Sequence, residues 1–285
     1  MNQFNDIYTD LACERKEADL SCPGIDYVKG SNINGTWERI TVKDKEGARA
    51  IGRPIGIYDS LHTDRLDTLD YEAIMGITEE LSGELCEIVE KSGAVATNIL
   101  VVGLGNEGLT PDAIGPESVD RIRATRHIYD ADEALFNTLG CAKISTLKPG
   151  VTSKNGLDSS LIVEAVAKEI QPDLVIAIDS LMARGRDRLG TTFQISNTGI
   201  IPGSGLGNSK NGIDESTLNA PVICIGVPTV IDSRALSQDK EKEIKKSSKK
   251  SGETLFVSPK EIGDIVENAA EIIGGAINLA FGIFG

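Results

Sequence analysis

The stretch ILVVGLGNEGLTPDAIGP, residues 99–116, decides the fold. An apolar strand runs into a glycine turn and then presents a carboxylate, Asp112, where a helix would normally begin. The stretch DLVIAIDS, residues 173–180, follows the same order, because its apolar run ends on Asp179. If the two strands are parallel neighbours, both carboxylates would point into one crevice outside the sheet.

Further apolar segments complete the pattern of an α/β protein. The sequence predicts additional strands at residues 36–42, 142–147, 191–196 and 221–227, and helices at about 70–92, at 158–170 and from near Pro259 onward. Several strands are too continuously apolar to have an exposed face, which is typical of parallel strands covered by helices on both sides. We therefore predict a three-layer α/β/α fold with a mostly parallel sheet.

The composition is that of a globular protein and narrows the choice of partners. The 285 residues are 40% apolar and carry a formal net charge of −14. This acidity argues against binding to nucleic acid, whereas a basic protein substrate would be attracted. Five scattered cysteines without CxxC spacing favour neither a disulfide framework nor a zinc site, which indicates a reducing, intracellular compartment.

We expect no targeting segment at either end of the sequence. The N-terminus is polar and lacks the basic start and apolar core of a secretory signal. The apolar tail, residues 270–285, is shorter than the roughly 20 residues that span a membrane. The charged run at residues 237–252 is predicted to be a mobile surface excursion of a single domain. We expect a cytoplasmic protein without a membrane partner.

Gly103, Gly105 and Gly108 spell the GxGxxG pattern of dinucleotide-binding proteins. In those proteins a helix follows the glycines at once, so that its N-terminus binds pyrophosphate. Here three residues intervene and Asp112 would bring negative charge to the phosphate position. The context therefore disfavours a nucleotide site, and we expect no cofactor.

Two serines are candidates for a nucleophile, Ser204 and Ser180. Ser204 lies in the glycine-rich segment PGSGLGN, but Pro202 stands where a nucleophile elbow requires glycine. Ser180 follows Asp179 directly, yet no histidine is near it in sequence. A serine triad is therefore a poor prediction.

The only two histidines, His62 and His127, give weak support for a metal site. We expect His127 to lie well inside the helix that begins near Gly115, and His62 to lie in a loop. No spacing demands a metal, although metal dependence stays open.

For Asp112 and Asp179, helix capping and catalysis are both open interpretations. Location favours catalysis, because open parallel sheets bind ligands outside the carboxyl ends of their strands. Two carboxylates in one crevice cannot both ionise easily, so the pair retains one proton, and a falling pH favours that state. The ionised partner can then accept a proton from water while the other protonates the peptide.

Motifs along nearly the whole sequence resemble those of the germination protease family, spore endopeptidases that degrade small acid-soluble spore proteins. These motifs are YTDLACE, GARAIGRPIG, LVVGLGNEGLTPDAIGP, VDRIRATRH, PDLVIAIDSLMAR, QISNTGIIPGSGLGN, PVICIGVPTVID and VSPKEI.

The resemblance implies an atypical aspartic protease whose two catalytic aspartates are Asp112 and Asp179. Family members are made as zymogens that cut themselves after an acidic residue, which implies cleavage between Asp10 and Leu11. Residues 1–10 would then be a propeptide and residues 11–285 the peptidase domain. The resemblance also implies a homotetramer, small acid-soluble spore proteins as substrates, and a place in the spore core, where degradation begins at germination.

Two departures from the family pattern stand out. Family members carry a considerably longer insertion between Asp232 and Val257 than this chain does. Ser180 stands where alanine is usual, beside a catalytic carboxylate.

Two other functions remain open. The fold and the opening motif also resemble hydrogenase-maturation endopeptidases, in which a nickel-sensing acid lies near the position of Asp112. That function predicts a metal-recognising peptidase, but the metal-binding histidine of that family has no evident counterpart here. The other alternative is a non-enzymatic binding protein on the same fold, favoured if neither aspartate lines a pocket.

Overall fold

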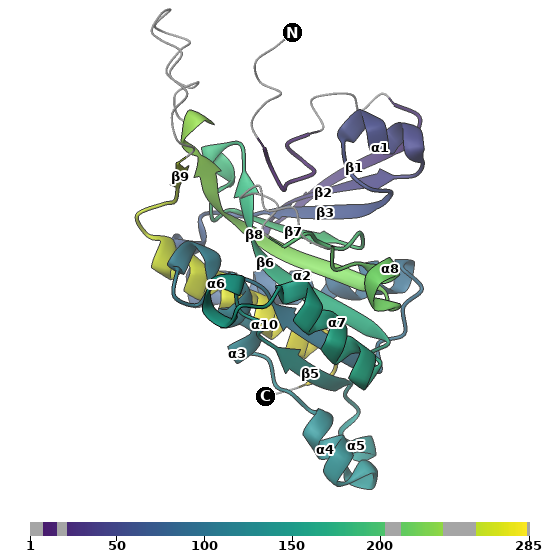
Figure 1. Ribbon diagram of the computed structural model, residues 1–285. Helices are drawn as coiled ribbons and strands as arrows, with labels where there is room; N and C mark the ends of the chain where they lie inside the picture. Colours follow the sequence, from purple (N-terminus) through teal and green to yellow (C-terminus); the bar gives the residue numbers. More distant parts are fainter. Residues whose placement is uncertain (1–7, 16–21, 203–211, 236–254, 284–285) are drawn as a thin grey trace, which may run out of the picture.

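The computed structural model describes residues 8–15, 22–202, 212–235 and 255–283. These residues form one nine-stranded sheet (Figure 1). Its strands are β1 (Ile25–Asn32), β2 (Gly35–Val42), β3 (Gly56–His62), β4 (Asn98–Gly103), β5 (Lys143–Leu147), β6 (Leu174–Ala183), β7 (Thr192–Ser196), β8 (Val222–Asp232) and β9 (Phe256–Val257). Across the sheet they run in the order β1-β2-β3-β7-β8-β6-β4-β5, with β9 paired to the end of β8.

The sheet is mixed, and the expected parallel arrangement describes one part of it. Strands β8, β6, β4 and β5 pair in parallel, whereas β1, β2, β3 and β7 pair antiparallel, as do β7 and β8. Polar and apolar residues alternate in β2, which leaves one of its faces partly exposed, as antiparallel strands allow. Strand β1 lies in a region where no strand was predicted, because its mostly exposed residues give no apolar signal.

Helices cover both faces, which confirms the predicted α/β class. Besides short 3₁₀ turns, of which η3 (Thr110–Asp112) matters below, the helices are α1 (Lys45–Ile51), α2 (Tyr71–Lys91), α3 (Ile114–Asp120), α4 (Arg126–Ala131), α5 (Glu133–Leu139), α6 (Thr152–Asn155), α7 (Ser159–Ile170), α8 (Glu215–Leu218) and α10 (Ile262–Ala280). The three helices predicted from the sequence correspond to α2, α7 and α10. Helices α2, α3 and α10 pack on one face, and α7 and α8 on the other (Figure 1).

Aspartates begin the two helices whose starts the sequence predicted best. The Asp70 side chain accepts a hydrogen bond from the Ala73 backbone N–H at the start of α2, and Asp158 accepts one from Ser160 at the start of α7. Such N-caps satisfy donors that the first helical turn leaves free, and each contributes about 1 kcal/mol. None of the helices in the described ranges has the length and apolar character of a membrane span.

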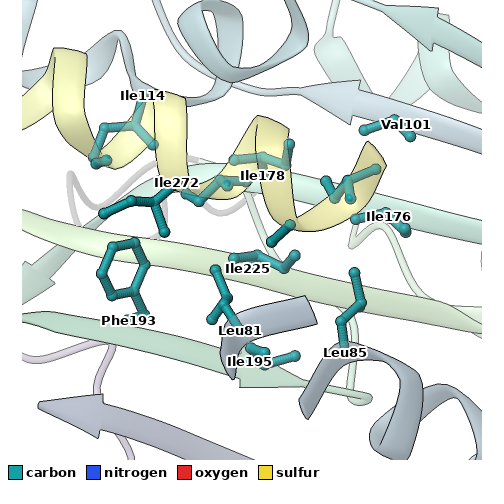
Figure 2. Close-up of a cluster of buried hydrophobic side chains, with 14 of the residues drawn as sticks. Leu81, Leu85, Val101, Ile114, Ile176, Ile178, Phe193, Ile195, Ile225 and Ile272 are labelled. Carbon is teal, nitrogen blue, oxygen red and sulfur yellow. The ribbon is translucent and has the colours of Figure 1, made fainter. Parts of the chain in front are cut away.

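The larger core lies between the sheet and the pair α2 and α10. Figure 2 shows Leu81 and Leu85 of α2 and Ile272 of α10 facing Ile176 and Ile178 of β6, and all five side chains are fully buried. Burial of one such aliphatic side chain contributes roughly 1.5–3 kcal/mol. This face therefore anchors the central strands. On the opposite face of β6, Val175 and Ala177 pack in a smaller core against α7, and Asp179 follows them in the same row of side chains.

Several sequence-based expectations concern residues outside the described ranges. The charged run at 237–252 and all but Pro202 of the PGSGLGN segment lie outside them, as do residues 1–7 of the expected propeptide. All five cysteines lie within them and are free thiols.

Candidate active site

Asp112 is held by the turn that follows β4. Gly105 has a φ of +112°, and the Asn106 backbone N–H donates to the carbonyl oxygen of Asp112 at 2.8 Å. The hydroxyl of Thr229 in β8 donates to the carbonyl of Pro111 at 2.6 Å. The glycine turn thus folds back on η3 and fixes the backbone of Asp112. As expected, no helix follows the glycines at once.

Asp179 comes from β6, but it does not end that strand. The strand continues to Ala183, so the expectation that Asp179 lies at the strand's carboxyl end was wrong. The reason is that β8 extends equally far and continues to pair with β6 beyond Asp179. Strand β4 ends where Gly103 pairs with Ile178, so Asp179 lies just beyond the end of its neighbour.

Neither aspartate caps a helix. The Asp179 carboxylate accepts a hydrogen bond from the Ser180 backbone N–H at 2.9 Å, within the strand. Helix α3 begins after Ala113 and has no side-chain cap. The capping interpretation therefore gains no support, and the two carboxylates are left for another role.

Both carboxylates line one cavity of about 950 Å³. Its wall combines the turn after β4, the middle of β6, the strands β7 and β8, and the N-terminal segment. The cavity confirms the prediction that the two acids share a crevice. A cavity of this size accommodates several residues of an extended peptide or a small ligand.

The cavity changes the acidity of both groups. Burial raises the pKa of Asp112 to about 6, and the Asn106 backbone N–H opposes part of that change. Burial also raises the pKa of Asp179 well above its usual value, and the negative charges of Asp112 and Asp10 raise it further. Asp179 is the more deeply buried of the two and faces both other acids, so the pair favours a state in which it holds one proton, on Asp179.

Asp10 lies beside this pair, at the cavity wall. Its backbone N–H donates to the Met182 carbonyl at 2.8 Å, and its carboxylate accepts from the Met182 N–H at 2.8 Å and from the Tyr8 hydroxyl at 2.7 Å. Leu11, on the other side of the expected cleavage point, is fully buried against Leu181 and Ala183 of β6. The bond between Asp10 and Leu11 is therefore bound in the site rather than free on the surface.

Both histidines lie outside the cavity, and both expectations about their elements were wrong. His62 is the last residue of β3 and lies 3.2 Å from the buried Glu38 carboxylate. His127 belongs to a separate helix, α4, because α3 ends at Asp120. Within the described ranges, no three histidine, cysteine or acidic side chains gather as metal ligands.

Three residues of the cavity wall were not singled out from the sequence. Arg53, Met182 and Gln194 all contact the segment that carries Asp10. Gln194 and Arg53 both lie in motifs that carry the family resemblance, QISNTGIIPGSGLGN and GARAIGRPIG, but nothing in their spacing assigns either residue a role. Ser180, beside Asp179, also lines the cavity, and its buried hydroxyl makes no hydrogen bond within the described structure.

Comparison with known proteins assigns the family. The family model described as "Germination protease" matches residues 5–246, which is most of the chain. The chain belongs to the germination protease family. A germination protease of Caldanaerobacter subterraneus subsp. tengcongensis is 34% identical over 309 aligned residues, covering 96% of this chain and 94% of the relative. The Bacillus subtilis germination protease is 36% identical and covers 84% of this chain and 67% of the relative.

Among solved structures, a [NiFe] hydrogenase maturation protease, HycI from Thermococcus kodakarensis KOD1, is similar to 68% of this chain and 99% of its own. The identity is 20% and the TM-score is 0.37. The family assignment rests on the sequence relatives, which identify the chain as a protease of the germination type.

Proposed function

We propose that this germination protease is an endopeptidase in which Asp112 and Asp179 activate water. The observation that carries the proposal is the shared cavity, in which burial raises the pKa of both acids and so favours one proton held between them. Two carboxylates that differ in acidity can serve as base and acid in one reaction. Here the more acidic Asp112 is the base and Asp179 is the acid.

The proposed reaction is a hydrolysis in two steps. Asp112 takes a proton from water while the water oxygen bonds to the carbonyl carbon, and Asp179 gives its proton to the carbonyl oxygen. The tetrahedral adduct then collapses. Its C–N bond breaks, the nitrogen takes up the proton held by Asp112, and a hydroxyl proton of the adduct returns to Asp179. The products are a carboxylic acid and an amine, and the pair regains its starting state.

We further propose that the chain is a zymogen that cuts itself between Asp10 and Leu11. The position of Asp10 beside Asp179 supports this, since its charge acts on that group directly. The substrates proposed are small acid-soluble spore proteins in the spore core, cut at the start of germination. A homotetramer is the proposed assembly. The proposed substrates and the proposed assembly rest on the family resemblance.

The test compares the purified full chain with Asp112→Asn and Asp179→Asn variants at mildly acid pH. Each is incubated alone and with a small acid-soluble spore protein, with and without EDTA, and the product termini are identified by mass. We expect cleavage after acidic residues, including Asp10, that both substitutions abolish and EDTA leaves unchanged.

Each other outcome has a definite meaning. Cleavage that survives either substitution would exclude the carboxyl pair. Loss of cleavage on adding EDTA would favour a metal-dependent peptidase of the hydrogenase-maturation type. If no protein is cut under any condition, the chain is better explained as a binding protein on this fold.

A further inference from the structure

The N-terminal segment is bound along the sheet by main-chain and side-chain hydrogen bonds at once. The main chain of Met182 contacts Asp10 twice, through its carbonyl to the backbone N–H and through its own N–H to the carboxylate. A backbone N–H that donates to a carboxylate makes a charge-assisted hydrogen bond, which is shorter and stronger than a neutral one. The main chain of Met182 therefore binds both the backbone and the side chain of Asp10.

Gln194 of β7 spans the bond that follows. Its Nε2 donates to the Asp10 carbonyl oxygen at 3.1 Å, and its Oε1 accepts from the Ala12 backbone N–H at 2.7 Å. One amide side chain thus contacts the chain on both sides of the bond between Asp10 and Leu11. Gln194 is only 8% exposed, so these contacts are shielded from water. Hydrogen bonds are stronger in such a buried environment than in water.

The sheet register explains why the contacts of Gln194 lie near the carboxyl pair. Gly226 of β8 pairs with Asp179 of β6 on one side and with Gln194 of β7 on the other. Residues in register have their side chains on the same face, so Asp179 and Gln194 flank a glycine, at a separation of roughly 10 Å for two strand spacings. Gly226 has no side chain, and the Leu181 side chain takes the space over it, since a Cβ on Gly226 would lie 2.6 Å from the Leu181 Cγ.

Arg53 holds the residue before the acid. Its guanidinium donates to the Thr9 carbonyl oxygen at 2.6 Å, and Arg15 approaches the same oxygen at 3.4 Å. The Nε of Arg53 is buried and makes no hydrogen bond in the described structure. A buried donor without a partner costs about 1–3 kcal/mol, so this arginine has binding capacity beyond its present contact.

We propose that Met182, Gln194 and Arg53 form the subsite for an acidic residue and the peptide bond after it, in which the Met182 N–H binds the acidic side chain and Gln194 and Arg53 position the peptide main chain. The segment Tyr8–Ala12 occupies the subsite in the full chain. After residues 1–10 leave, an extended peptide with an acidic residue takes the same contacts. The inference rests on the proposed function, because it assumes that the bond after Asp10 is the one cut.

The experiment measures self-cleavage of the full chain after Asp10 in Gln194→Leu, Arg53→Gln and Asp10→Asn variants. Arg49→Gln is the matched control, since Arg49 is an exposed arginine of α1 that loses the same charge outside the cavity. We expect each of the three subsite variants to cut at least about tenfold more slowly, as a loss of roughly 1.4 kcal/mol implies. The control should cut at the wild-type rate.

A double-mutant cycle separates recognition from a merely structural role. If Gln194 and Asp10 act through one bound geometry, the Asp10→Asn, Gln194→Leu double variant cuts no more slowly than the slower single variant. Independent damage to the fold would instead multiply the two losses. Thermal unfolding of each variant is followed in parallel. Should Gln194→Leu unfold, Gln194→Glu replaces it, because it keeps the size of the side chain and removes the donor to Asp10.

The outcomes distinguish this inference from the proposed function. If the wild type cuts after Asp10 and needs both cavity aspartates, while Gln194→Leu and Arg53→Gln cut at the wild-type rate, the subsite assignment is wrong and the carboxyl pair stands. Multiplicative losses in the cycle would also overturn the assignment. If the wild type does not cut after Asp10, or cuts without Asp112 or Asp179, the proposed function fails first.

Discussion

Gly105 and Asp112 lie in direct backbone contact: a Cβ atom on Gly105 would lie 2.1 Å from the carbonyl oxygen of Asp112. The glycine also has a φ of +112°, which other residues rarely adopt. Within the GxGxxG pattern, this turn is the part that positions Asp112. It brings the loop after β4 against η3 and so aims one acid into the cavity.

Gly105→Ala should consequently reduce both activity and stability. The new methyl group forces the Asp112 carbonyl away and strains the turn, at an expected cost of about 1–3 kcal/mol. Chemical unfolding and the self-cleavage rate measure the two effects. The matched control is Gly83→Ala, at an exposed position of α2 where a Cβ meets nothing within 4 Å. The control should be neutral or stabilise by up to about 1 kcal/mol.

The raised pKa of Asp112 predicts a pH-dependent contribution to stability. A carboxyl whose pKa rises from 3.8 to about 6 on folding stabilises the fold fully below about pH 4 and loses that contribution as the pH rises through about 6. Asp112→Asn removes this dependence. The advantage of wild type over the variant should fall by on the order of 1–2 kcal/mol between about pH 4 and pH 7. A flat difference across that range in urea titrations would contradict a raised pKa.

The same two pKa shifts predict the shape of the pH profile for self-cleavage. The rate should rise as Asp112 ionises near pH 6 and fall at higher pH as Asp179 loses its proton. Single-turnover rates of the full chain across this range test the prediction. A rate independent of pH would argue against the carboxyl pair and against the expectation that it must retain one proton.

His62 is predicted to be structural. Its Nδ1 lies 3.0 Å from the Thr192 hydroxyl and 2.8 Å from the Arg188 guanidinium, and its Nε2 faces Glu38. His62→Gln should leave the self-cleavage rate unchanged and lower the free energy of unfolding by about 1–3 kcal/mol, because buried polar partners lose hydrogen bonds. If the variant folds normally but no longer cuts, His62 is required for catalysis, and a metal-dependent mechanism must be considered again.

Leu81 tests the core beneath the central strands. It is fully buried between α2 and the sheet (Figure 2), so Leu81→Ala should lower the free energy of unfolding by about 2–5 kcal/mol. Leu161→Ala in α7 is the control, because Leu161 is 54% exposed. That substitution should change stability by no more than about 0.5 kcal/mol. Denaturant titrations of both variants give the comparison.

The amino-acid sequence alone determined the α/β class, the main helices and the two acids. Continuous apolar runs at 98–103 and 173–178 suffice to predict central strands, since only burial on both faces tolerates them. A carboxylate that follows such a run needs an explanation, so Asp112 and Asp179 could be found by their positions. The family could be recognised in the same way, because its motifs are continuous stretches of sequence.

Only the tertiary structure decided what surrounds the acids. The pairing of β7 with β8 puts Gln194 in register with Asp179, and a loop more than 100 residues away in sequence brings Arg53 to the same wall. Strand β1 and the extension of β6 past Asp179 were likewise missed, because edge exposure and the length of a neighbouring strand leave no periodic signal. Local patterns record which residues are buried, whereas the contacts that hold a peptide depend on which strands become neighbours.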